Sequence, residues 1–270
     1  MIQTIVNNRP IKLFILLGGF FIANALIAEF IGVKIFSLEK TLGLTPANFS
    51  FFGVDNLSFN LTAGVLLWPV VFVMTDIINE YYGMRGVRLL SWLAAGLIAY
   101  AFVMFYFGIH LTPADFWPQS HIPTELDETG KQAILSKVSD YDYAYRLVFG
   151  QGLWIIIGSL IAFLIGQIID VKVFHRIKRM TGDRFIWLRA TGSTLISQFI
   201  DSFVVLFIAF YIGANWSLSL VLAIGVVNYI YKFVMAIALT PCLYLARMAI
   251  EAYLGKEQAS ELKAAALAES

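Results

Sequence analysis

Long apolar runs, each bounded by polar or charged residues, constrain this chain more than any other feature of its sequence. An α-helix rises about 1.5 Å per residue, so about 20 apolar residues match the hydrocarbon thickness of a bilayer. The composition agrees: 59% of the residues are hydrophobic and only 14% are charged, whereas a soluble domain has roughly 25% charged residues. The sequence therefore predicts an all-α membrane protein, folded as a six-transmembrane-helix bundle.

The expected spans divide the chain into one membrane domain, residues 1–246, and a C-terminal tail, residues 247–270. A long polar segment, residues 110–145, separates the third span from the fourth. In the fourth span Gly158, Ala162 and Gly166 recur at every fourth position, a pattern that lets two helix backbones approach closely. The six expected spans are residues 13–36, 60–80, 89–109, 147–170, 188–212 and 218–246.

The distribution of lysine and arginine predicts how the chain is oriented, because cytoplasmic loops are enriched in both residues. Thirteen of the 19 lysines and arginines lie in the N-terminal segment, the turn at residues 81–88, the segment that follows residue 170, and the tail. We therefore expect both termini on the cytoplasmic side and residues 110–145 on the periplasmic side.

Charged side chains recur inside the apolar spans, most clearly in residues 69–83. Asp76 and Glu80 lie four positions apart, on one face of a helix. A charge within the hydrocarbon costs about 2.5–3.5 kcal/mol on insertion scales, so both need a protein interior, a partner or a solvated cavity. The alternative is a helix end at the membrane surface, which fits Glu80 better than Asp76 because Glu80 lies close to Gly83.

Other spans carry comparable residues. Asp201 lies about midway along the fifth span with Gln198 just before it, and Asn228 and Lys232 are one helical turn apart in the sixth. Polar groups inside a bundle mark substrate or ion pathways, although hydrogen bonds between helices explain some of the amides and Lys232 could simply neutralise Asp201 or Asp76. The candidate substrate-binding residues are Asn24, Glu29, Trp68, Asp76, Glu80, Gln167, Asp170, Gln198, Asp201, Asn228, Tyr229, Tyr231 and Lys232.

This mixture of acids, amides and aromatic rings suits a planar polar ligand rich in N–H donors. A carboxylate can accept two N–H bonds from the edge of a guanine-like ring, as side chains pair with base edges. Trp68, Tyr229 and Tyr231 offer faces for stacking.

Several other functions receive less support from the sequence. Asp76 and Asp201 could face each other as in an intramembrane aspartate-dependent enzyme, but the Gly-x-Gly-Asp context of such enzymes is absent, as are zinc-protease, rhomboid and P-loop motifs. The net charge of +1 says nothing about a nucleic-acid partner, and no basic stripe argues for one. Cys242 is the single cysteine, and His110 and His121 do not predict a metal site. We expect no enzyme activity, no cofactor and no metal.

Four short motifs together resemble one known family. They are Thr75-Asp76 before Tyr82-Gly83, the run Gly166-Gln167-Ile-Ile-Asp170-Val171 followed by Phe174, Ser193-Thr194 with Asp201, and Tyr229 with Lys232. In this combination, over about residues 20–245, the chain resembles the queuosine precursor transporter family. That family is also described as vitamin uptake transporters.

The resemblance implies a bacterial inner-membrane protein whose helices resemble the substrate-binding subunits of energy-coupling-factor transporters. It also implies uptake of 7-deazaguanines, such as 7-cyano- or 7-aminomethyl-7-deazaguanine, for tRNA modification. Two alternatives stay open, a gradient-driven carrier and the binding subunit of a multi-component transporter with a separate energising module, and so does a homodimer. The positions that match the family pattern are Asn24, Asp76, Gln167, Asp170, Asp201 and Lys232.

Overall fold

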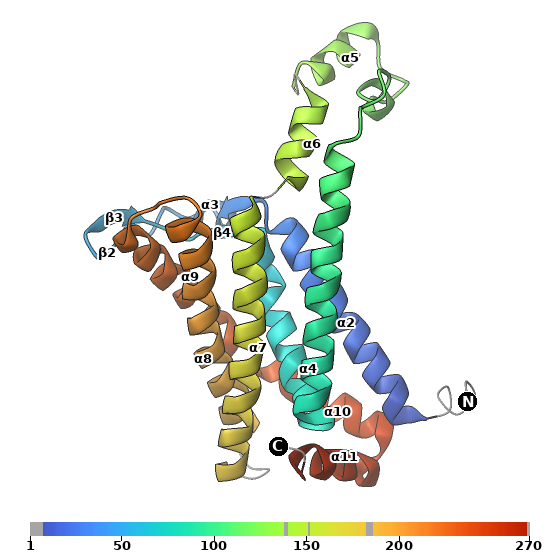
Figure 1. The fold of residues 1–270 in the computed structure, drawn as a ribbon, viewed down its shortest axis with the longest axis vertical. Coiled ribbons are helices and arrows are strands. Elements are labelled where there is room, and N and C mark those ends of the chain that lie inside the picture. The colour runs from blue at the N-terminus through green and yellow to red at the C-terminus, as the bar shows by residue number, and fades with distance from the viewer. Residues whose placement is uncertain (1–7, 138–139, 151, 182–185, 269–270) are drawn as a thin grey trace. The chain divides into compact units, whose positions relative to one another are not determined.

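The computed structural model describes residues 8–137, 140–150, 152–181 and 186–268. The chain divides into two compact units, residues Met1–Leu97 with Leu153–Ser270, and residues Ile98–Gly152. The described residues are mostly helical, and they include five helical segments long and apolar enough to cross a membrane. The structure is therefore that of an all-α membrane protein, with small strands only outside the long helices (Figure 1).

The first long helix, α2 (Arg9–Ile31), begins where the side chain of Asn8 accepts a hydrogen bond from the backbone N–H of Ile11. Pro10 occupies the first turn, where its missing N–H is not needed. The helix ends at Gly32, before the expected end of the span at residue 36, because the next residues pair with a strand. The exposed face of α2 is apolar, as Leu16 and Phe20 illustrate, which suits contact with lipid.

The segment between α2 and the next long helix forms two small antiparallel sheets instead of an unstructured loop. Strand β1 pairs with β4, so that Ile35 faces Thr62, and β2 pairs with β3. Residues 60–66 were expected to begin the second span, and this expectation is wrong because their backbone groups bond to β1 or form a 3₁₀ turn. The elements are β1 (Ile35–Ser37), α3 (Leu38–Thr41), β2 (Phe49–Phe51), β3 (Val54–Leu57), β4 (Asn60–Thr62) and η1 (Ala63–Leu66).

Helix α4 (Trp68–Ile109) is interrupted at Gly83, whose φ of 67° and ψ of −171° are not helical. The hydroxyls of Thr75 and Ser91 donate to the same oxygen, Oε1 of Gln167, over 3.0 and 3.4 Å. In a straight helix two residues sixteen positions apart would be separated by about 24 Å. The chain therefore reverses at Gly83, and only a residue that tolerates positive φ fits this turn without strain.

The remaining long helices are α7 (Leu153–Thr181), α8 (Ile186–Leu206) with the π-helix η3 (Phe207–Ile212), and α9 (Leu218–Ala238). Helix α7 continues beyond the expected end at residue 170, so Lys172, Arg176, Lys178 and Arg179 lie on this helix. The sixth span was expected to reach residue 246, but α9 ends at Ala238 and Pro241 opens the separate helix α10 (Thr240–Leu254). Helix α11 (Lys256–Ala268) follows, at the opposite end of this unit from the strands (Figure 1).

Small residues bring α7 against α8 and η3, as their spacing predicted. A Cβ atom added at Gly158 would lie 3.2 Å from the backbone oxygen of Val205, and Ala162 is fully buried. At Gly166 an added Cβ would lie 3.6 Å from Cβ of Asp201. This close packing fixes the polar side chains of the two helices relative to each other.

The second unit contains the end of α4, the turn η2 (Gln119–His121), and helices α5 (Glu128–Leu135) and α6 (Tyr141–Phe149). Aromatic rings pack within it; the centroids of Phe105 and Phe149 are 5.0 Å apart. Two acids of this polar segment act as N-caps, Asp127 for α5 and Asp140 for α6. The polar segment at residues 110–145 thus contains short helices among the residues that the structure describes.

Candidate functional site

A small cavity lies among four helices of the first unit. Helix α4 places the carboxylate of Asp76 at this cavity, α8 contributes Gln198, and α9 contributes Lys232. Three residues of the predicted site therefore meet there, although they lie far apart in the sequence. The lining is Pro69, Val73, Asp76, Thr191, Thr194, Gln198, Lys232, Ala236 and Leu243.

The carboxylate of Asp76 is held by hydroxyl groups of α8. Thr194 donates to Oδ2 over 3.1 Å and Ser193 donates to Oδ1 over 3.4 Å. Asp76 is only 3% exposed, so the neighbouring hydroxyls replace part of the hydration that a buried anion loses.

Asp170 of α7 does not line this cavity and is fully buried. Its Oδ1 accepts a hydrogen bond of 3.0 Å from Ser197 of α8, whereas its Oδ2 has no hydrogen-bond partner among the described residues. Gln198, which does line the cavity, also has an unpartnered buried oxygen, Oε1. Oδ2 of Asp170 and Oε1 of Gln198 therefore have no hydrogen-bond donor among the described residues, although buried acceptors normally have one.

Lys232 forms an ion pair with Asp201, in which Nζ lies 2.6 Å from Oδ2. The side chains of Lys232 and Asp201 are 8% and 18% exposed. The sequence offered neutralisation of Asp201 as one explanation of Lys232, and the structure shows this contact. Lys232 also lines the cavity, so its ammonium group lies at the cavity wall with its charge partly neutralised by Asp201.

The other predicted site residues do not line this cavity. Gln167 joins the two halves of α4 through Thr75 and Ser91, and it lines a different cavity with Ser91 and Lys172. Asn24 donates to the backbone oxygen of Phe20 in its own helix.

Glu29 accepts a hydrogen bond from Ser159 of α7, which links α2 to that helix. Asn228 is half-buried in α9.

The predicted aromatic residues pack against apolar neighbours. Trp68 lies 5.6 Å from Phe163 between ring centroids, and Tyr229 meets Phe199 edge to face at 5.2 Å. Tyr231 packs in a cluster with Leu61 and Val65. These contacts anchor helices and leave no ring of the three at the cavity wall.

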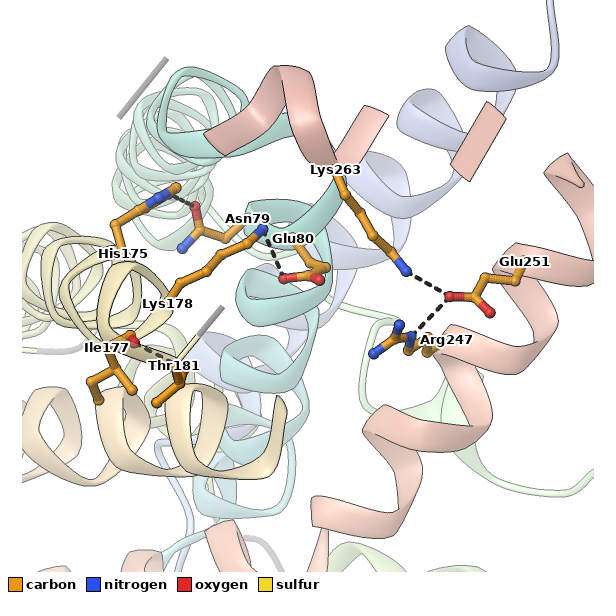
Figure 2. A network of polar contacts seen from close by, with 9 residues as sticks. All are labelled: Asn79, Glu80, His175, Ile177, Lys178, Thr181, Arg247, Glu251 and Lys263. Carbon is orange, nitrogen blue, oxygen red and sulfur yellow. Dashed lines mark hydrogen bonds and ion pairs between the residues drawn. The ribbon is translucent and has the colours of Figure 1, made fainter. Parts of the chain in front are cut away.

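A second polar network lies near the reversal at Gly83, and most of its residues were not in the predicted site (Figure 2). Nε2 of His175 lies 2.7 Å from Oδ1 of Asn79, and Nζ of Lys178 lies 3.2 Å from Oε2 of Glu80. Lys178 is only 2% exposed, although it belongs to the basic segment that follows residue 170. Its burial could have been inferred from the continued spacing of Val171, Phe174, His175 and Lys178, which face one side of α7.

Helices α10 and α11 complete this network. Glu251 accepts from Arg247 over 2.8 Å and from Lys263 over 2.6 Å (Figure 2). Nζ of Lys263 lies 5.2 Å from the ring centroid of Tyr81. A Cβ at Gly83 would lie 3.1 Å from the backbone oxygen of Ala266, so α11 packs directly on the reversal.

Long apolar helices around buried carboxylates, amides and a lysine are typical of a multi-pass membrane transporter. The model of the family described as "Putative vitamin uptake transporter" matches residues 62–246. The chain belongs to this family, which is a family of transporters and not of enzymes.

Named relatives agree with this assignment. The chain is 32% identical over 202 residues to the "Probable queuosine precursor transporter" of Bacillus subtilis, an alignment covering 73% of this chain and 76% of the relative. It is 25% identical over 241 residues to the "Queuosine precursor transporter" of Escherichia coli, covering 84% of this chain and 92% of that protein. A protein of Haemophilus influenzae named "Probable queuosine precursor transporter" is 25% identical over 203 residues, covering 74% of this chain and 72% of the relative. No solved structure matches the chain.

Proposed function

We propose that this protein takes up a queuosine precursor of the 7-deazaguanine class across the bacterial inner membrane. The observation that carries the proposal is the cavity at which Asp76, Gln198 and Lys232 meet, in a chain whose relatives bear the queuosine precursor name.

The polar groups of the cavity match the hydrogen-bonding edge of such a ring. In the proposed complex the carboxylate of Asp76 accepts the N–H donors of the guanine-type edge. The free Oε1 of Gln198 accepts a further N–H, and Lys232 donates to the ring carbonyl. Adenine lacks this arrangement of donors, so it would leave buried groups unpaired and should compete weakly.

The proposed topology has six spans, because the reversal at Gly83 divides α4 into two crossings. The end of the bundle that holds Gly83, Lys178 and α11 then faces the cytoplasm, as do both termini. Residues 110–145 lie in the periplasm. Cysteines introduced at Ser120 and Thr181 should label from opposite sides; equal labelling from outside would contradict this orientation.

We further propose that the chain transports as an independent carrier and needs no separate energising subunit. The chain has no P-loop motif, which leaves two possibilities, a gradient-driven carrier and a binding subunit with a separate energising partner, and the family resemblance favours the first. Uptake by the purified chain alone in liposomes would support this view. Binding of the deazaguanine without uptake would instead indicate a substrate-binding subunit.

The test of function is uptake of radiolabelled 7-cyano-7-deazaguanine into liposomes that contain the purified protein. We expect Asp76→Asn to reduce uptake at least ten-fold, because the amide offers one acceptor where the carboxylate offers two. Asp55→Asn is the matched control, since Asp55 is exposed in β3 and outside the cavity. Equal uptake by Asp76→Asn and the control would remove Asp76 from the substrate site, and competition by adenine as strong as by guanine would refute the proposed recognition.

A further inference from the structure

Asp76 and Asp170 are two fully or nearly fully buried carboxylates joined by hydroxyl groups from one helix. Helix α8 supplies Ser193 and Thr194 to Asp76, and Ser197 to Asp170. Asp76 faces the proposed substrate cavity, whereas Asp170 does not line it. The hydroxyl groups that hold the two carboxylates therefore come from neighbouring positions of α8.

Neither carboxylate forms an ion pair with a lysine or arginine in the part of the chain that the structure describes. Two neighbouring anions without a counter-ion are costly in a low-dielectric interior, and such pairs relieve the cost by binding a proton. Hydroxyl groups can solvate a charge but cannot cancel it.

The charged groups around the pair are already engaged. Glu80, one turn along α4, is paired with Lys178 of α7, and Lys232 of α9 is paired with Asp201 of α8. From α10, Arg247 lines a cavity together with Asp76 and Glu80, and it shares Glu251 with Lys263. His175 of α7 is held by Asn79.

The hydrogen bonds show that the network also lacks donors. Each serine hydroxyl has one proton, yet Ser193 lies within reach of both Asp76 and the backbone oxygen of Ala190 (3.1 Å). Ser197 likewise lies 3.0 Å from Asp170 and 3.0 Å from the backbone oxygen of Thr194. Oδ2 of Asp170 has no donor at all among the described residues.

A proton on Oδ1 of Asp170 supplies a donor for the contact with Ser197 without any movement of the backbone, and it leaves Oδ2 as an oxygen of an uncharged carboxyl group. The carboxyl O–H then donates to Oγ of Ser197, and the Ser197 hydroxyl donates to the backbone oxygen of Thr194. When the proton leaves, the same hydroxyl rotates to donate to the carboxylate. Because a hydroxyl both donates and accepts, the site accommodates either state.

We propose that Asp76 and Asp170 bind the proton whose movement drives uptake, so that the protein is a proton–substrate symporter. The inference rests on the function proposed above. Substrate N–H donors favour the ionised form of Asp76, which directs the proton to Asp170. The proton comes from water on the outer side, is carried on a carboxylate oxygen, and is released to water on the inner side together with the substrate.

The experiment uses the full chain in liposomes and two assays of labelled 7-cyano-7-deazaguanine. Exchange of labelled for unlabelled substrate at equal pH needs no driving force, whereas accumulation against a gradient needs coupling. With one proton per substrate and the membrane potential held at zero, an interior one pH unit more alkaline should give about ten-fold accumulation. The unmodified protein should show both activities, and its uptake should make the outer solution more alkaline, as reported by a pH-sensitive dye.

Asp170→Asn imitates the protonated carboxyl and cannot release a proton. We expect it to retain exchange but to lose accumulation and the dye signal, while Asp170→Glu retains all three. Asp55→Asn is again the control and should behave like the unmodified protein. Gln198→Glu cannot take this role because Gln198 lines the substrate cavity.

The outcomes separate the two proposals. Exchange by the unmodified protein without pH-driven accumulation overturns proton coupling and leaves the proposed function intact. Accumulation driven by a sodium gradient at equal pH, or full coupling in Asp170→Asn, also overturns it. Absence of exchange in the unmodified protein overturns the proposed function and the coupling with it. If Asp170→Asn fails to fold, the dye signal of the unmodified protein and of Asp170→Glu still decides.

Discussion

Five carboxylates of helices α4, α7, α8 and α10 fall into two groups that differ in what faces them. Glu80, Asp201 and Glu251 each lie within 3.2 Å of a lysine or arginine nitrogen. Asp76 and Asp170 are met by serine and threonine hydroxyls instead. All five are carried by helices α4, α7, α8 and α10, so the helical framework alone does not distinguish the groups.

The difference separates carboxylates whose charge is required from carboxylates whose charge can vary. An ion pair in a dry interior holds two charges permanently, because removal of either leaves the other uncompensated. A carboxyl surrounded by hydroxyls can gain or lose a proton with little reorganisation, since each hydroxyl can reverse its role. The ion-paired group therefore stabilises the bundle and its reversal at Gly83, while the hydroxyl-bound group is suited to transport.

The largest expected effect comes from breaking the most buried ion pair. Lys178→Met keeps the length of the side chain but leaves Glu80 without its lysine, and the loss of one partner of a buried pair costs about 3–5 kcal/mol. The side chains of Lys178 and Glu80 are only 2% and 4% exposed, so solvent cannot compensate. Unfolding of the detergent-solubilised protein, followed by its apparent melting temperature, measures the loss.

The double variant Lys178→Met/Glu80→Gln is the matched control, because it removes both charges. It should recover most of the lost stability. If the single and double variants are equally unstable, the pair does not carry the stability assigned to it.

A smaller effect on stability, joined to a large effect on uptake, is expected for Asp201→Asn. The substitution leaves Lys232 charged and unneutralised at the cavity wall, at a cost of about 1–3 kcal/mol. The side chain of Asp201 is 18% exposed, so the cost should be lower than for Lys178. Uptake should fall at least ten-fold, because a free lysine at the wall offers an ionic partner to Asp76 in competition with the substrate. Normal folding with unmodified uptake would make the Asp201–Lys232 pair irrelevant to the site.

Glu39 lies outside the membrane-spanning helices, and its carboxylate is held mainly by backbone N–H groups. Burial tends to raise the pKa of Glu39, but hydrogen bonds from the backbone N–H groups of Phe59 and Ala47 and from Ser37 outweigh it and lower the pKa below its ordinary value. A lowered pKa in the folded state means that the stabilisation is present above the unfolded-state pKa and is lost as the pH falls through the folded-state pKa.

We therefore expect the segment between α2 and α4 to loosen in acid before the helices do. The protection of the backbone amides of residues 38–60 against hydrogen exchange should fall below about pH 4. The loss should be largest at the amide of Phe59, which donates to Glu39 over 2.9 Å. Glu39→Gln should exchange faster at neutral pH and show little further change in acid. Protection of the Phe59 amide that is the same at pH 3 and pH 7 would contradict this assignment.

The class of fold could be predicted from the sequence because it depends on a local property, the length of apolar runs. Asp76, Gln198 and Lys232 could be nominated for the same reason, since each interrupts such a run. The small sheet at residues 35–62 could not, because an apolar stretch such as residues 60–66 reads as a helix until its strand partner is known.

The sequence also could not predict which charged residues form ion pairs. Asp76 and Glu80 lie one helical turn apart on α4. The carboxylate of Asp76 nevertheless accepts from hydroxyls of α8, whereas that of Glu80 pairs with Lys178 of α7. That difference depends on how far α7 extends and which face it turns to α4, both of which are decided by tertiary packing.

The smallest expected effect on stability is that of Asp170→Asn, and it tests the comparison from its other side. If Asp170 belonged with the paired carboxylates, its neutralisation would cost several kcal/mol, as for Lys178. Because no cation pairs with it among the described residues and Oδ2 is unpartnered, the amide should change the free energy of unfolding by less than about 1 kcal/mol, or should increase it by relieving repulsion with Asp76. The amide nitrogen can donate to Oγ of Ser197 as the protonated carboxyl does, so the hydrogen bond to α8 is kept. Melting temperatures of Asp170→Asn and Lys178→Met, measured together in the same detergent, make the test direct. A loss of stability in Asp170→Asn as large as in Lys178→Met would place Asp170 among the structural anions and end the distinction between the two groups.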